Sequence, residues 1–100
     1  MKLVDSARII RSKNAGPTQI TIDILFDDAE AFERARSSDN LSPSAIAQRY
    51  GLAPEQVRII PYPPAHALKV VMDRAVVAGT PGDRDVYGAQ QHGPLLDLVL

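Results

Sequence analysis

The chain has 100 residues, of which 45% are hydrophobic and 23% charged, with a net charge of −1. This is the size and balance of one globular domain over residues 1–100, and the charge predicts no general affinity for nucleic acid or anionic lipid. Cysteine is absent, which excludes disulfides, thiolate nucleophiles and cysteine metal sites. The N-terminus does not resemble a signal peptide, and no apolar run approaches the roughly 20 residues of a membrane helix, so we expect a cytoplasmic protein without a membrane segment.

The first quarter of the chain predicts two strands. Residues 3–10 are rich in apolar side chains and are expected to form the first strand. Residues 11–17 then contain the turn formers Asn14, Gly16 and Pro17. Residues 19–26 alternate apolar with mostly polar side chains at every second position, which is typical of a half-buried strand.

Two short helices are expected next. Asp27 followed by Glu30 has the spacing of a capping box and predicts a helix to about Arg36, with apolar positions 29, 32 and 35 turned inward. Residues 37–40 are polar and end that helix. Ser42 is a favourable cap for a second helix with Pro43 at its first position, residues 46 and 50 on one face, and Gly51 as its stop.

The second half of the chain predicts further strands. Residues 57–62 and 67–73 are strand candidates, separated by a corner that prolines 61, 63 and 64 stiffen. Residues 79–83 are expected to form a loop, residues 86–92 a helical turn, and residues 95–100 a last strand. Without the first strand the order is βαββαβ, so the predicted fold is α+β: a ferredoxin-like two-layer sandwich with a mostly antiparallel sheet and helices on one face.

The segment 11–17 is the first candidate binding site. Its backbone N–H groups and the bases Arg11 and Lys13 could hold a carboxylate or phosphate, with Ser12 and Asn14 orienting the anion and Gly16 in the turn. The alternative is an ordinary hairpin whose bases face water and whose Gly16 supplies a positive φ. The segment matches neither a Walker loop nor a dinucleotide fingerprint, and no cofactor is expected.

The segment 83–94 is the second candidate. His92 could act as a general acid or base near neutral pH, Tyr87 could donate a hydrogen bond to an oxyanion, and Asp85 is a third polar group in the same loop. The alternative is a helix capped by Asp85 with a solvated polar face. No metal site is expected, because His66 and His92 are the only histidines and neither belongs to a compact ligand pattern.

The two segments together carry a family resemblance. Arg-Ser-Lys-Asn-Ala-Gly-Pro at 11–17 and Asp-Val-Tyr-Gly-Ala-Gln-Gln-His-Gly-Pro-Leu-Leu at 85–96 resemble the domain-of-unknown-function family 4387 over nearly the whole chain. That family resembles, more distantly, the ferredoxin-fold C-terminal domain of acyclic terpene utilisation (AtuA-type) proteins. The first loop of those domains commonly reads Arg-Ser-Gly-Asp-Lys-Gly, to which Arg11, Ser12 and Gly16 correspond, and their late Asp and Gly correspond to Asp85 and Gly88.

The resemblance implies a small accessory subunit that works with a larger AtuA-type partner. Such a heteromeric enzyme would act as a hydratase or lyase on a small carboxylate or an acyl-CoA thioester, with residues 11–16 holding the anion and residues 85–92 acting in catalysis. The competing hypothesis is a non-catalytic interaction module that docks through a sheet edge or the apolar C-terminus. A second copy of the chain is another candidate partner, and a stand-alone enzyme is a third hypothesis.

Overall fold

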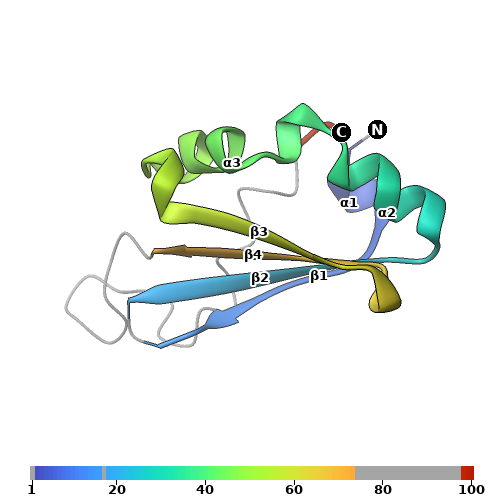
Figure 1. The fold of residues 1–100 in the computed structure, drawn as a ribbon, viewed down its shortest axis with the longest axis horizontal. Coiled ribbons are helices and arrows are strands. Elements are labelled where there is room, and N and C mark those ends of the chain that lie inside the picture. Colours follow the sequence, from blue (N-terminus) through green and yellow to red (C-terminus); the bar gives the residue numbers. More distant parts are fainter. Residues whose placement is uncertain (1, 17, 74–97) are drawn as a thin grey trace.

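Alternating apolar side chains along residues 19–26 build the centre of an antiparallel sheet that helices cover on one face (Figure 1). The computed structural model describes residues 2–16, 18–73 and 98–100. The expected loop at 79–83, the helical turn at 86–92 and the start of the expected last strand lie outside these ranges. The helices and strands are α1 (Leu3–Ser6), β1 (Ala7–Asn14), β2 (Gln19–Phe26), α2 (Ala29–Arg36), α3 (Pro43–Tyr50), β3 (Val57–Tyr62) and β4 (Ala67–Asp73).

The sheet has the strand order β1-β2-β4-β3, and each neighbouring pair is antiparallel. β2 and β3 are therefore parallel to each other, with β4 between them and the two longer helices connecting them. This is the split βαβ unit of ferredoxin-like folds, and the predicted α+β two-layer sandwich is confirmed. The predicted βαββαβ order left out the first strand. In the structure, β1 belongs to the sheet and forms its edge beside β2.

The N-terminal prediction is corrected in two places. Residues 3–6 form a helical turn rather than the start of a strand, and Leu3 is buried in the core. The strand begins at Ala7 and continues to Asn14, through positions that were expected to belong to a turn. Pairing with β2 supplies backbone hydrogen-bond partners along residues 11–14, and this outweighs their turn propensity. The chain reverses after Asn14, and Gly16 has φ +102°, as the hairpin interpretation expected.

The start of α2 differs from the predicted capping box by one residue. Asp28 is the N-cap, and its Oδ1 accepts a hydrogen bond from the Ala31 N–H at 2.8 Å. Phe32 and Ala35 are buried as predicted, whereas Ala29 is exposed. Residues six apart lie about 120° apart around a helix, so Ala29 and Ala35 do not share one narrow face.

The local signals for α3 are confirmed. The Ser42 Oγ accepts a hydrogen bond from the Ala45 N–H at 3.2 Å, and Pro43 occupies the first helical position. Gly51 ends the helix with φ +68°, a left-handed conformation that carries a steric penalty for residues with a Cβ. Ile46 is buried and Tyr50 packs partly buried against the core, as their shared face predicted.

The core lies between the helices and the facing side of the sheet. Its fully buried large side chains come from both layers and both chain ends: Leu3, Ile20, Ile22, Ile24, Phe26, Phe32, Ile46, Leu68, Val70, Met72 and Leu98.

The last residues run beside the first ones on the helical side (Figure 1). The Leu98 carbonyl accepts a hydrogen bond from the Leu3 N–H at 2.7 Å, and Val99 makes one antiparallel bridge with Lys2. Residues 98–100 thus do not extend the four-stranded sheet, contrary to the expected last strand. The helices α1, α2 and α3 have at most eight residues each, and no helix in the described ranges could span a membrane.

Candidate functional site

Strand alternation divides the first predicted site between two faces of the sheet. In the register of β1 with β2, Ser12 lies opposite Ile22 and Asn14 opposite Ile20, which places Ser12 and Asn14 on the side that the helices cover. Arg11 and Lys13 lie on the other side, because successive strand residues point to opposite faces. The structure therefore does not let these four side chains converge on one anion.

Arg11 has an acidic neighbour across the hairpin. Its Nε lies 3.7 Å from the Asp23 Oδ2, and these two residues are paired in the strand register. The Arg11 side chain is 67% exposed, whereas that of Asp23 is 18% exposed. Arg11 thus remains accessible, and its role as an anion ligand stays a prediction.

The face of the sheet turned away from the helices has a definite chemical pattern. Three cross-strand rows follow from the register, and in the described ranges no helix packs on them. We call these residues the outer sheet face: Ile9, Leu25, Ala67 and Tyr62 in the first row, Arg11, Asp23, Lys69 and Ile60 in the second, and Lys13, Thr21, Val71 and Arg58 in the third.

The outer sheet face combines positive charge with exposed apolar area. Its four cations come from three strands, and its one carboxylate, on Asp23, is paired with Arg11. Asp73 follows at the end of β4, and its Oδ2 accepts a hydrogen bond from the Gln56 Nε2 at 3.2 Å. Three large apolar side chains are exposed on this face, with Tyr62 at 59%, Ile60 at 43% and Ile9 at 37%. Such a surface suits a partner that offers both acidic and apolar groups.

This surface was not among the sites predicted from the sequence. Arg58, Ile60, Tyr62 and Lys69 all lie in strands that were predicted correctly. The alternation within each strand was visible, but the order of the strands was not. The signal that could have found the surface is the set of positions facing away from the apolar stripes of 57–62 and 67–73.

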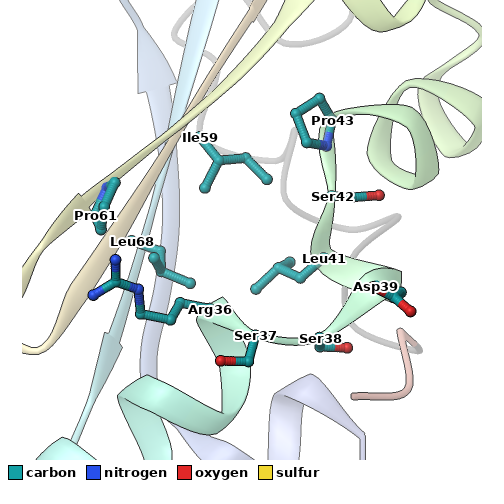
Figure 2. A pocket seen from close by; sticks show the side chains of 10 residues that line it. All are labelled: Arg36, Ser37, Ser38, Asp39, Leu41, Ser42, Pro43, Ile59, Pro61 and Leu68. Atoms are coloured by element: carbon teal, nitrogen blue, oxygen red, sulfur yellow. The ribbon is translucent and has the colours of Figure 1, made fainter.

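A second candidate site is a cavity of about 370 Å³ on the helical side of the sheet. It lies where the end of α2, the following 3₁₀ turn at Asp39–Leu41 and the start of α3 face the edge strand β3 (Figure 2). Its lining consists of Arg36, Ser37, Ser38, Asp39, Leu41, Ser42, Pro43, Ile59, Pro61 and Leu68. Residues 37–39, which line part of it, were predicted only to end a helix.

Several polar side chains around this cavity have structural roles. The Ser42 Oγ caps α3, and the Ser38 Oγ accepts a hydrogen bond from the Asn40 N–H at 3.3 Å. In Figure 2 both hydroxyl groups point away from Ile59 and Leu41, which point into the cavity. These two hydroxyl groups are therefore engaged in capping rather than directed at an occupant of the cavity.

Arg36 is the cation of the cavity lining. Its Nη1 lies 3.3 Å from the Glu33 Oε1, and its guanidinium carbon lies 5.6 Å from the centre of the Phe32 ring. The Arg36 side chain is 40% exposed and that of Glu33 is 59% exposed, so this is a surface ion pair. Figure 2 shows the guanidinium extending from α2 toward Pro61 on β3.

Asp85, Tyr87 and His92 lie outside the described residues. His66, which was not expected to bind a metal, is half-buried at the turn between β3 and β4 and has φ +50°. Its backbone carbonyl accepts a hydrogen bond from the Phe26 N–H at 2.9 Å, which gives it a structural role. Within residues 2–16, 18–73 and 98–100, no three potential metal ligands lie together.

Comparison with known proteins gives one family assignment. The family model described as "Domain of unknown function (DUF4387)" matches residues 3–99. Neither the curated proteins nor the solved structures gave a significant match.

Proposed function

Because the chain belongs to the domain-of-unknown-function family DUF4387, whose description names no reaction, we propose a function from its surface chemistry: it is a small accessory subunit of a heteromeric enzyme. The partner is a larger AtuA-type subunit. The complex acts as a hydratase or lyase on a small carboxylate or an acyl-CoA thioester. The resemblance of Arg11, Ser12 and Gly16 to the first loop of AtuA-type domains supports this choice of partner.

The observation that carries the proposal is the outer sheet face. Tyr62 and Ile60 present adjacent apolar groups beside the cations of β1, β3 and β4. Burying such side chains stabilises a complex by about 25 cal/mol per Å² of apolar area, before the cost of association. The cations add steering toward an acidic partner surface.

The other docking routes have less support. β3 is an edge strand, but Pro61 removes one backbone donor from it, which weakens pairing with an added strand. Leu98 is fully buried, so the C-terminal apolar segment is not free as a whole to bind a partner. We therefore propose that the partner contacts the outer sheet face.

Co-expression with an AtuA-type protein, followed by native mass spectrometry, tests the proposal. We expect a stable hetero-complex that the double change Ile60→Ser and Tyr62→Ser disrupts. Val4→Ser is the matched control, because Val4 is an apolar side chain of similar exposure (46%) on α1. A chain that stays a monomer or homodimer beside this partner would refute the proposal.

A second pair of variants tests how much charge contributes to binding the partner. Lys69→Glu reverses a charge in the middle row of the outer sheet face, whereas Arg34→Glu makes the same change on a helix, where Arg34 is 49% exposed. Lys69→Glu should lower the affinity of the complex and make that affinity less dependent on salt concentration. Arg34→Glu should change neither the affinity nor its salt dependence. Equal effects of both changes would show that the outer sheet face is not the contact.

The non-catalytic alternative is separated by activity. If the chain only binds, the partner alone should turn over substrate as fast as the complex does. If the chain is an accessory subunit of the enzyme, turnover should depend on its addition at a one-to-one ratio.

A further inference from the structure

The cavity beside Arg36 has both polar and apolar walls. Leu41 and Leu68 are 3% and 1% exposed and lie at its base, while Ile59 and Pro43 point into it from β3 and α3 (Figure 2). A volume of about 370 Å³ is in the range of small-molecule sites, whose linings are mainly apolar with a few polar groups that orient the ligand. The apolar part of this lining can contact a hydrocarbon group of an occupant.

Arg36 adds one positive charge at the side of these walls. A guanidinium has five N–H donors, and the contact with Glu33 involves one nitrogen, Nη1. An exposed ion pair of this kind contributes little to stability, so a ligand anion can share or replace it. Contact between the guanidinium and the Phe32 ring restricts the side chain and lowers the entropy lost on binding.

The other polar groups do not favour a cationic or sugar-like ligand. The Ser38 and Ser42 hydroxyl groups are turned toward the backbone N–H groups that they cap. The Asp39 carboxylate points away from Ile59 and Leu41 in Figure 2. The lining thus offers one cation, with the Ser37 hydroxyl group, beside apolar carbon, which matches a monoanion with a hydrocarbon chain.

We propose that this cavity binds a small monocarboxylate whose hydrocarbon chain contacts Leu41, Ile59 and Leu68 and whose carboxylate pairs with Arg36. Planar guanidinium and carboxylate groups form paired hydrogen bonds, which distinguishes this contact from a simple charge attraction. The site is made by one chain and does not depend on the proposed partner. Its failure would leave the accessory-subunit proposal untouched, and the converse also holds.

Titration of the isolated full-length chain with hexanoate, followed by backbone amide NMR, tests the proposal. We expect saturable shifts at residues 36–43 and 59–61. Acetate, which lacks the chain, and hexanol and hexylamine, which lack the negative charge, should each bind at least about tenfold more weakly. Equal binding of hexylamine, or shifts confined to the outer sheet face, would overturn the proposal.

Two arginines of α2 provide the matched variants. Arg36→Gln should weaken hexanoate binding about tenfold or more, because a charge-assisted contact is lost. Arg34→Gln should leave it unchanged, since Arg34 pairs with Glu30 at 3.5 Å and does not line the cavity. Unchanged binding by Arg36→Gln would show that Arg36 does not hold the carboxylate.

Filling the cavity is an independent test. Ile59→Phe adds volume at a half-buried wall position and should reduce hexanoate binding without removing any charge. A thermal unfolding curve for each variant establishes that it is folded under the conditions of the titration. A folded Ile59→Phe chain that binds hexanoate as tightly as the parent would place the site elsewhere and refute the proposal.

Discussion

Arg11 on β1 and Asp23 on β2 lie directly opposite each other, with the Arg11 Nε 3.7 Å from the Asp23 carboxylate. This pairing places Arg11 in a strand and separates it from Ser12 and Asn14, which were expected to share a ligand with it. It also links the predicted binding segment to a surface that extends across all four strands.

The first prediction concerns the strength of that pair. In a double-mutant cycle with Arg11→Gln and Asp23→Asn, the coupling in the free energy of unfolding should be below about 1 kcal/mol, because Arg11 is largely exposed to water and salt. Urea denaturation of the four chains measures it. A coupling of about 3 kcal/mol or more would mean that Arg11 is a structural residue and not an available cation.

The second prediction identifies the cap of α2. Asp28→Ala should lower the free energy of unfolding by about 1 kcal/mol, since the Ala31 N–H loses its acceptor. Asp27→Ala is the control: Asp27 contacts Arg8 at 3.4 Å on the surface, and its loss should cost less than about 0.5 kcal/mol. Chemical denaturation measures the loss of stability in each variant. A larger loss for Asp27→Ala than for Asp28→Ala would indicate that Asp27 caps the helix, as the sequence predicted.

The third prediction distinguishes core from docking at the C-terminus. Leu98→Ala should cost about 2–5 kcal/mol in the isolated chain, because Leu98 is fully buried. Val99→Ala should cost less than about 1 kcal/mol, since Val99 is 49% exposed. If Leu98→Ala left the thermal midpoint unchanged, the C-terminal leucine would again be a candidate partner contact.

The fourth prediction concerns alkaline pH. Burial raises the pKa of Tyr50 above its ordinary value of 10.0, and the nearby Arg49 opposes this in part. As the pH rises above about 10, the unfolded chain releases the phenol proton while the folded chain keeps it, so stability falls by up to about 1.4 kcal/mol per pH unit.

Urea denaturation between pH 8 and 11 measures this slope. Tyr50→Phe should make the decline shallower, because the group that titrates in the unfolded chain is gone. Tyr62→Phe, the same change at an exposed position, should keep the steep decline. A Tyr50→Phe chain that loses stability as steeply as the parent would show that other groups dominate the alkaline limb.

Local signals predicted much of the fold because their physical causes are local. The alternation along residues 19–26 placed Ile20, Ile22 and Ile24 on one buried face whatever their partners were. Ser42 and Gly51 bounded α3 because a cap acts on N–H or C=O groups within a few residues. The misplaced cap of α2 shows where local signals fail. Asp27 and Asp28 both carry a carboxylate that can accept the hydrogen bond, and the backbone geometry selects Asp28.

The candidate sites depended on contacts that local signals do not specify. Arg11, Lys69 and Ile60 form one row only because β4 lies between β2 and β3. Arg36 and Ile59 line one cavity although more than twenty residues separate them along the chain. Neither arrangement has a signature within a window of ten residues.

By itself, then, the sequence determined the α+β class, the apolar stripes of three strands and the limits of α3, because propensity, capping and alternation act over short distances. The tertiary structure decided that residues 11–14 form an edge strand, that Leu98 belongs to the core and that the cations of three strands share one face. These outcomes depend on which strands pair and in what register, and pairing is chosen by the burial of the whole core rather than by any single segment.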